Sequence, residues 1–393
     1  MKRIQIVACS ALAVALMGSC SKDQVTQENP GNAIRFKSIT SSATKVAETT
    51  TGDVTDFKVY AFTGTNPTFT PFYTDVYTNN GLGSTYVSDN GITHYWPADQ
   101  SLNCVFTGYS PADLSNSFVT APTDNVTDPS QAATRTISGI QPKQNAADQV
   151  DLLVFRGWGT AANNATDGVT LYMKHAMSQI QVKAVNSDAT MTVKVKGVKV
   201  VAKNKANLAL PDNGTSQSAA FTISHWTMAD DAAYTSYLSM GDETVMSSQA
   251  DAPTDLMYAN GGFMLIPQAL TSWTGGADAD GAYIAVLCQI SQGGTQLYPT
   301  TTGQFGYAAV AIPTGTTWQP GMKYVYTLKF FDNGGGGGTQ PPVDPTDPTE
   351  PVDPGNPGDP VLGNPIKLTV DVTTWADGLN LGTTPDAGDV AME

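Results

Sequence analysis

Cysteine and histidine are scarce in this chain of 393 residues, which has four cysteines and only three histidines, His94, His175 and His225. No H-E-x-x-H, G-x-S-x-G or G-x-x-x-x-G-K-[ST] motif is present, so the sequence lacks the usual signatures of metalloproteases, serine hydrolases and nucleotide-binding proteins. A pair of carboxylates for glycoside hydrolysis remains an alternative, because two such residues can be distant in sequence and close in space. The sequence points to no particular pair. We therefore expect that this protein is not an enzyme and that it binds no cofactor and no metal ion.

Positive charge is also scarce, with 20 lysines and arginines against 35 aspartates and glutamates and a formal net charge of −15. A chain this acidic is repelled by phosphate, so we expect no nucleic-acid partner. Beyond the N-terminus, no apolar run is long enough to cross a bilayer as a helix.

The N-terminus, MKRIQIVACSALAVALMGSC, has two cations, a short apolar run and small residues before Cys20. This order is typical of a secretion signal. Met17-Gly18-Ser19-Cys20 resembles the lipobox of bacterial lipoproteins, in which the cysteine is acylated. The alternative is an ordinary signal peptide with an incidental cysteine. We expect residues 1–19 to be removed and Cys20 to carry the lipid, palmitate included, on a polar tether over 20–32.

Two further cysteines, Cys104 and Cys288, lie in the body of the chain. Their separation in sequence favours two buried thiols that pack as small hydrophobic groups, while a disulfide between them remains the alternative.

Threonine, serine, asparagine, glycine and aromatic residues are plentiful, a composition that favours strands over helices. Short alternating runs recur with turn residues between them; they cover 56–62, 178–185, 191–200, 282–290 and 324–330. No comparable stretch has a long helical period. We predict an all-β fold of two tandem β-sandwich domains. The turn signal at 186–189 places the boundary between an N-terminal domain, 33–186, and a C-terminal domain, 187–332.

The segment 333–365 has the composition of a linker. Five glycines, 334–338, precede PPVDPTDPTEPVDPGNPGDP, in which a proline recurs at every third position from Pro342 to Pro360. Polyproline II has three residues per turn, so this rod spans on the order of 60 Å. Its acidic residues do not suit calcium, because successive carboxylates lie about 9 Å apart along the rod and a calcium ion needs several oxygens at about 2.4 Å.

Beyond the linker, the tail 366–393 begins with one alternating strand whose apolar face holds Ile366, Leu368, Val370 and Val372. A lone strand is not stable in water. It either folds back onto its own domain or adds to a neighbouring subunit as a donor strand. We favour the second, because a strand of its own domain needs no long tether.

A matching feature lies near the N-terminus. Residues 33–38 alternate as a first strand, and 41–46 form a small, polar, cationic segment. A trypsin-like cut after Lys45 would make Val46 the new N-terminus and remove that strand, which would leave unpaired backbone. The alternative is an edge strand followed by an ordinary loop.

Taken together, these features resemble the fimbrillins of Bacteroidia, the FimA and Mfa-like lipoprotein precursors of type V pili. The stretches that carry the resemblance, besides the lipobox, are 34–36, 44–45, 57–62, 94–97, 106–111, 151–154, 174–180, 318–321 and 324–326. The resemblance implies two transthyretin-like β-sandwich domains, secretion as a lipoprotein, trimming by an Arg- or Lys-directed protease, and polymerisation by strand exchange. Lys45 stands where the family often has arginine, and the tether is longer than a stalk subunit needs.

We therefore expect a stalk subunit or a tip or accessory component of a type V fimbria that serves adhesion. Its partners would be other fimbrial subunits, the outer membrane through the lipid, and a host or bacterial surface ligand. The alternative is a surface lipoprotein that does not polymerise and binds glycans. For that function Trp158, Trp226 and Trp273 lie near loops, whereas the other tryptophans, Trp96, Trp318 and Trp375, are expected to anchor strands.

Overall fold

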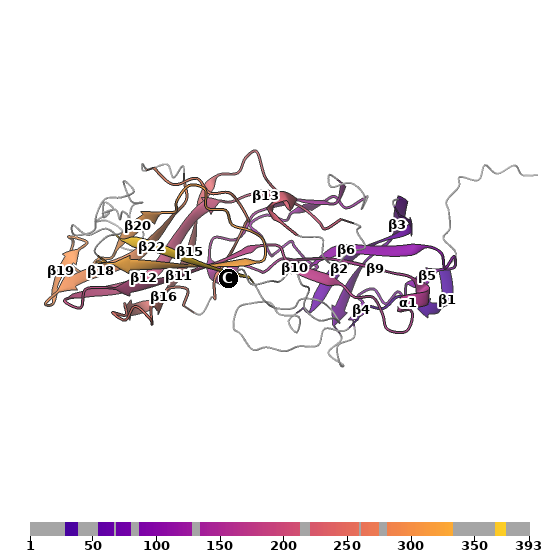
Figure 1. Cartoon of the computed structure of the whole chain (residues 1–393), viewed down its shortest axis with the longest axis horizontal. Coiled ribbons are helices and arrows are strands. Elements are labelled where there is room, and N and C mark those ends of the chain that lie inside the picture. The colour runs from indigo at the N-terminus through magenta and orange to yellow at the C-terminus, as the bar shows by residue number, and fades with distance from the viewer. Residues whose placement is uncertain are drawn as a thin grey trace, which may run out of the picture.

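The computed structural model shows an elongated molecule built almost wholly of strands (Figure 1). It describes residues 28–37, 54–66, 68–79, 86–127, 134–212, 221–258, 261–274, 281–332 and 366–374. The predicted signal, Cys20, Lys45, Val46, the Gly/Pro linker and Trp375 lie outside the described residues. In the part described, no helix is long and apolar enough to span a membrane.

The first half of the molecule is centred on an antiparallel sheet in the order β10-β9-β6-β2-β3-β4. Its strands are β2 (Asp56–Thr65), β3 (Thr68–Asn79), β4 (Tyr86–Ser88), β6 (Asn103–Ser110), β9 (Leu153–Gly159) and β10 (Tyr172–His175). Side chains of β2 alternate between two apolar clusters: Phe57 and Val59 enter one, and Tyr60 and Phe62 enter the other. Both faces of this sheet are therefore covered.

A second sheet, β14-β13-β8-β7, packs on the Phe62 face. Its strands are β7 (Thr123–Asp124), β8 (Thr136–Ile140), β13 (Ala206–Ala209) and β14 (Trp226–Met228). On the Phe57 face lie the short ribbon of β1 (Glu28–Ala33) with β5 (Tyr95–Pro97) and the helix α1 (Ala161–Asn164), at the end of the molecule (Figure 1).

The second half is a sandwich of two sheets around one large core. One sheet has the order β16-β11-β21-β22 with β17 beside β11, from β11 (Ser178–Asn186), β16 (Thr254–Asp255), β17 (Phe263–Leu265), β21 (Met322–Phe330) and β22 (Lys367–Thr374). The other has the order β15-β12-β18-β19 with β20 beside β18, from β12 (Met191–Lys203), β15 (Tyr234–Val245), β18 (Tyr283–Gln292), β19 (Thr295–Tyr298) and β20 (Gly306–Ala311). The described residues also form short 3-10 helices, η2 (Ala146–Asp148) and η3 (Ile223–His225).

The predicted all-β class is confirmed, and the five alternating runs all fall in strands. However, the strand pairing does not change at residue 186. β11, which ends there, pairs in parallel with β21 of the second half, while β13 and β14, which follow it in sequence, join β8 in the first half. The chain therefore passes between the halves more than once, and a sequential boundary near 186 does not separate the sheets.

Cys104 and Cys288 are both free and fully buried, in the cores of different halves. The buried-thiol prediction is confirmed and the disulfide alternative is wrong. Burial raises the pKa of the Cys104 thiol to about 12, and burial likewise raises the pKa of Cys288. Both sulfurs are therefore protonated and unreactive at physiological pH.

The burial of the tryptophans differs in part from the prediction. Trp96 and Trp318 are fully buried, as predicted for strand anchors. Trp226 and Trp273, expected near open loops, are also buried, at 7% and 2% exposure. The indole N–H of Trp226 donates to the carbonyl of Ala176 inside the core, so it offers no platform to a ligand. Of the three candidates, Trp158 alone is half-buried.

Candidate functional site

The N-terminal segment, residues 28–37, is seated against the first half of the molecule. We predicted a strand over 33–38, but β1 ends at Ala33 and the residues that follow are held by an irregular set of bonds. The N–H of Ile34 donates to the carbonyl of His94 at 2.8 Å. Val169 then donates to the carbonyl of Arg35 at 2.7 Å and accepts from the N–H of Lys37 at 2.9 Å. After Ala33, these three bonds and the pairing of β1 with β5 before it connect the backbone of the segment to the rest of the fold.

Apolar packing also holds this segment in place. Ile34 and Phe36 are each 5% exposed, and the exposed Arg35 lies between them. The ring of Phe36 packs edge-on against three aromatic rings, with centroid distances of 5.6 Å to Phe57, 4.8 Å to Tyr77 and 5.3 Å to Phe106. The segment thus supplies part of the core that covers the Phe57 face of the main sheet.

Gly168 allows the segment to approach this closely. Its φ is +78°, a conformation that favours glycine, and a Cβ there would lie 3.0 Å from the carbonyl oxygen of Arg35. A side chain at this position would strain the turn and press on the segment.

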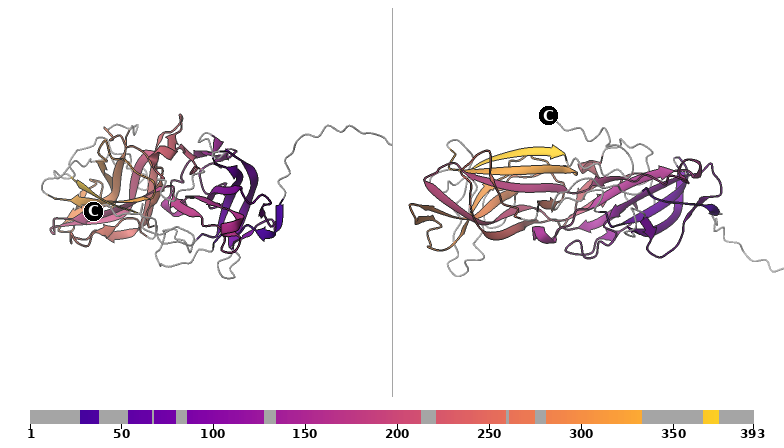
Figure 2. Two further views of the ribbon diagram at one scale, coloured as in Figure 1. Left: turned by 45° about the vertical axis from the view of Figure 1, so that its right-hand side comes forward. Right: turned by 90° about the horizontal axis from the view of Figure 1, so that it is seen from below.

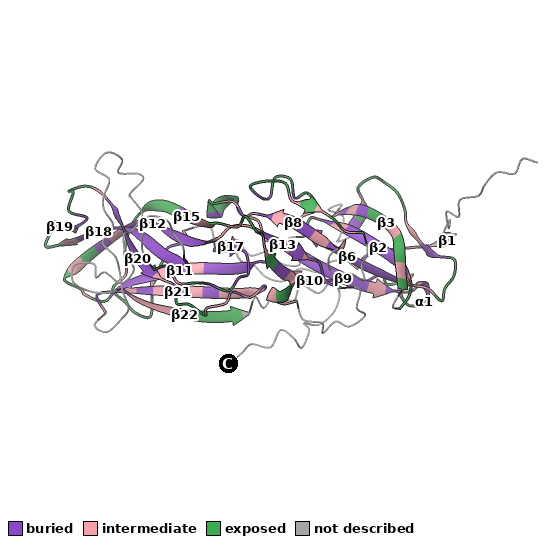
Figure 3. Ribbon diagram, turned by 90° about the horizontal axis from the view of Figure 1, so that it is seen from above, coloured by how far each residue is buried: buried purple, intermediate pink, exposed green. Residues whose placement is uncertain are grey.

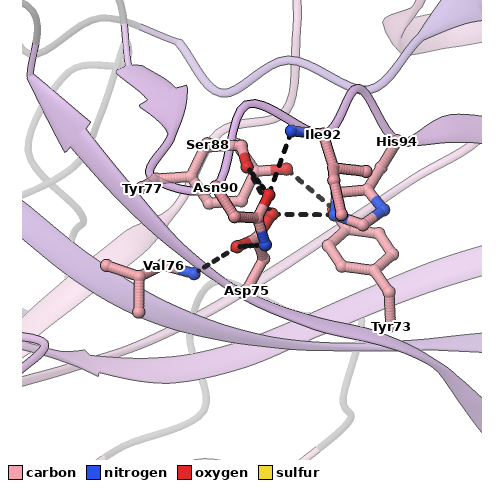
Figure 4. A network of polar contacts seen from close by, with 8 residues as sticks. All are labelled: Tyr73, Asp75, Val76, Tyr77, Ser88, Asn90, Ile92 and His94. Atoms are coloured by element: carbon pink, nitrogen blue, oxygen red, sulfur yellow. Dashed lines mark hydrogen bonds and ion pairs between the residues drawn. The ribbon is translucent and has the colours of Figure 1, made fainter.

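A partly buried polar network around Asp75 holds the neighbouring stretch of chain in place (Figure 4). The carboxylate of Asp75, on β3, accepts from the backbone N–H of Val76 at 2.8 Å, the hydroxyl of Ser88 at 2.7 Å and the side-chain amide of Asn90 at 3.1 Å. Nε2 of His94 lies 2.8 Å from the same carboxylate. The imidazole stacks on the ring of Tyr73, 3.7 Å between centroids.

These groups form hydrogen bonds with one another, so the network suits a structural role better than a catalytic one. It positions the stretch around His94, whose carbonyl receives Ile34 of the N-terminal segment. The other histidines are also in structural settings: Nδ1 of His175 lies 2.7 Å from the buried carboxylate of Asp151, and His225 packs beside Phe221. Over the described ranges, no three of His, Cys, Asp or Glu form a group that would hold a metal.

The predicted donor strand is β22, and here it pairs with its own chain. It lies antiparallel to β21 at the edge of its sheet (Figure 2). Leu368 stands opposite Leu328, Val370 opposite Tyr326, and Val372 opposite Tyr324. Because paired residues of antiparallel strands point to the same face, the four apolar positions share the core-facing side, as the alternation predicted.

The core covers only the first part of that face. Ile366 is 1% exposed and Leu368 is partly buried against the core, but Val370 and Val372 are 43% and 44% exposed. Figure 3 shows exposed residues toward the C-terminal end of β22, at the margin of the molecule. Among the described residues, the strand in this position therefore leaves two apolar side chains uncovered and has no strand paired to its outer edge.

The N-terminal segment and β22 lie in different halves of the molecule (Figure 1). The sequence indicated both segments as candidates for strand exchange. It did not predict the Asp75 network, although Tyr73, Asp75 and Tyr77 alternate on one face of β3.

Comparisons place the chain among known proteins. The sequence profile of the fimbrillin-like family matches residues 44–343, which excludes both the N-terminal segment and β22. No curated protein matches in sequence.

Among solved structures, similarity extends to a candidate cell adhesion protein from Bacteroides uniformis, at 14% identity and a TM-score of 0.41, covering 88% of this chain and 98% of that one. A candidate cell adhesion protein from Bacteroides eggerthii is similar at 12% identity and a TM-score of 0.41, covering 87% and 95%. The tip fimbrial protein Mfa3 from Porphyromonas gingivalis is similar at 11% identity and a TM-score of 0.30, covering 81% and 94%.

Proposed function

The chain belongs to the fimbrillin-like family, and we propose that it is a structural or tip component of a type V fimbria, assembled when protease trimming allows strand exchange. Membership of the family implies association with other fimbrial subunits and a place at the cell surface. The more specific steps below are our proposal. A structural role of this kind needs no catalytic site.

The first step is export as a lipoprotein. Acylation at Cys20 would hold the precursor at the outer membrane through the tether 20–32. Cys20→Ala should leave unprocessed precursor and no protein in the outer-membrane fraction, whereas Cys9→Ala, inside the discarded signal, should leave processing unchanged.

The second step is a cut after Lys45. Lys45 lies between the seated residues 28–37 and the start of the main sheet near Val54, so the cut would separate the N-terminal segment from the rest of the fold. The segment would then be held by the pairing of β1 with β5, by the bonds to His94 and Val169, and by Ile34 and Phe36. Burial of these two side chains contributes about 1.5–3 kcal/mol each. Without a covalent tether it loses the high effective concentration that keeps it in place.

Departure of the segment would leave an apolar groove. Its walls would include the rings of Phe57, Tyr77 and Phe106, which Phe36 covers in the intact chain. Its backbone edge would include the N–H and C=O of Val169 and the C=O of His94, which now bond to the segment. Such a site selects an extended strand with alternating apolar side chains.

The third step is filling of that groove by β22 of a neighbouring subunit, with Ile366, Leu368, Val370 and Val372 as its apolar anchors. The observation that carries the proposal is the incomplete burial of β22 on its own chain, where Val370 and Val372 are 43% and 44% exposed. Each valine would gain up to about 1.5 kcal/mol in a site that covers it fully. The linker 333–365, with its rod of about 60 Å, would give the strand its reach.

The competing outcome is that β22 stays beside β21. The same linker keeps the strand near its own edge at high effective concentration, and Ile366 is already buried there. Exchange is favoured only if the neighbour's groove covers the two valines that this position leaves exposed.

The experiment follows from that difference. In protease-trimmed protein, Val370→Asp should abolish polymers, because a carboxylate would be desolvated without a partner in the groove. It should leave the monomer folded, since Val370 is exposed there. Thr373→Asp, exposed and on the opposite side of the strand, is the matched control and should still polymerise. Polymers of normal length from Val370→Asp, seen by electron microscopy, would refute the donor-strand role.

A further inference from the structure

A small pocket lies in the first half of the molecule, where β6 begins and β9 runs into α1. Its volume is about 210 Å³. Its lining comes from two aromatic residues, three asparagines and two threonines, with one glycine: Asn103, Trp158, Gly159, Thr160, Asn163, Asn164, Thr170 and Tyr172. All of these side chains are uncharged, on a chain whose formal net charge is −15.

The aromatic part of the pocket is a stacked pair on neighbouring strands. Trp158 of β9 and Tyr172 of β10 lie with ring centroids 5.0 Å apart and planes inclined by 20°. Trp158 is half-buried against the core and Tyr172 is 8% exposed, so burial and stacking restrict the motion of both rings. A ring that is already immobilised loses little entropy when a ligand packs against it.

The two asparagines of α1, Asn163 and Asn164, have different roles at the pocket. Oδ1 of Asn164 accepts from the N–H of Thr160 at 3.1 Å, and its Nδ2 donates to the carbonyl of Gly168 at 3.0 Å. Asn164 is therefore used in holding the turn. Asn163 is exposed, and its side-chain amide makes no hydrogen bond to any described residue.

Two further polar groups are similarly available. The amide of the half-buried Asn103 and the hydroxyl of Thr170, which is 9% exposed, make no hydrogen bond within the described part of the chain. With Asn163, the pocket presents two primary amides and one hydroxyl, all of which both donate and accept. A polar group buried beside a pocket is best satisfied by a ligand or water with matching donors and acceptors.

We propose that this pocket binds one ring of a neutral saccharide. A pyranose has an apolar face of C–H groups that packs on an aromatic ring, whose face carries partial negative charge. Its rim of hydroxyls both donates and accepts, which matches the amides of Asn103 and Asn163 and the hydroxyl of Thr170. The absence of a cation in the lining disfavours acidic sugars. The volume is below the roughly 300–1,000 Å³ of pockets for drug-sized ligands, so a single ring is the unit that fits.

This inference is independent of polymerisation. The pocket contains no residue of the N-terminal segment or of β22, so it is present in the uncut monomer. A fimbrial subunit that carries it would have a weak, repeated contact for a glycan surface, and repetition along a polymer raises avidity without any new contact.

The test uses full-length protein and the methyl glycosides of glucose, galactose, mannose, fucose and N-acetylglucosamine, with N-acetylneuraminic acid as an acidic probe. Saturation-transfer NMR should detect at least one neutral glycoside at millimolar concentration and not the acidic sugar. Asn163→Ala should weaken that binding about tenfold, the loss expected for one hydrogen bond to a ligand. Asn116→Ala, an exposed asparagine outside the pocket, should bind as the parent does.

Trp158→Ala should abolish the signal, and its melting curve checks that the protein remains folded. If that variant does not fold, Asn103→Ala and Asn163→Ala combined replace it, because neither side chain holds the structure. The proposal is overturned if no neutral glycoside binds the parent protein, if only N-acetylneuraminic acid binds, or if the pocket variants bind as well as the Asn116→Ala control.

Discussion

The ring of Phe36 lies edge-on against the ring of Tyr77, with 4.8 Å between their centroids. Phe36 precedes Lys45 and Tyr77 follows it, so the contact joins the two parts of the chain that the proposed cut would separate. Stability of the uncut precursor and readiness of the trimmed subunit to accept a strand therefore depend on the same few side chains.

Phe36→Ala should lower the free energy of unfolding of the uncut protein by about 3–5 kcal/mol, because it removes a buried aromatic ring from a packed core. Arg35→Ala, at the neighbouring exposed position, should change it by no more than about 0.5 kcal/mol. Denaturant titration of both variants measures the difference. Equal small effects would mean that the segment contributes little to the fold.

The Asp75 carboxylate should also matter for stability. Asp75→Ala leaves His94, Ser88 and Asn90 without their common acceptor and should lower the free energy of unfolding by about 1–3 kcal/mol, the usual cost of leaving hydrogen-bonding groups unsatisfied. Asp89→Ala, exposed at the end of the next strand, is the control and should be nearly neutral. A loss of less than about 1 kcal/mol for Asp75→Ala would show that water replaces the network at no cost.

Much of this architecture could be predicted from the sequence. The alternation of Phe57, Val59 and Ala61 identified β2, because successive side chains of a strand point to opposite faces of the sheet. The run at 366–373 identified β22 for the same reason.

Other features depend on partners distant in the sequence. β11 belongs with the second half because it pairs with β21, about 140 residues later, and a local pattern does not reveal that pairing. The position of the N-terminal segment depends on bonds to Val169 and His94, and β1 ends at Ala33, where alternation predicted a strand to begin. Trp158 and Trp226 are alike in sequence context, yet only the fold shows which one borders a pocket.

The two thiols provide a check on the packing. Burial raises the pKa of Cys104 to about 12, so the reactive thiolate is scarce at every pH below that value and increases only as pH rises toward it. The native protein should resist iodoacetamide at pH 8, and the protein unfolded in urea should be alkylated at both Cys104 and Cys288. Rapid labelling of either cysteine in the native state, measured by mass spectrometry, would contradict the buried arrangement.

Limited trypsin digestion should cut after Lys45 before it cuts after Arg35 or Lys37. The backbone of the last two is hydrogen-bonded to Val169, which keeps it from the extended, detached form that a protease needs. Intact mass should then give Val46 as the new N-terminus, and Lys45→Ala should slow the cut while Lys37→Ala should not. First cleavage at Lys37 would place the processing site within the seated segment instead.

The central claim is that trimming creates a second acceptor for the C-terminal strand. Calorimetric titration of a peptide covering 361–378 into protein ending at Asp332 tests this directly. Uncut protein offers only the β21 edge that β22 normally occupies, so one peptide should bind per chain. Protein trimmed to begin at Val46 should bind two, and the second should be lost when the peptide carries Val370→Asp. One peptide per chain both before and after trimming would contradict the account.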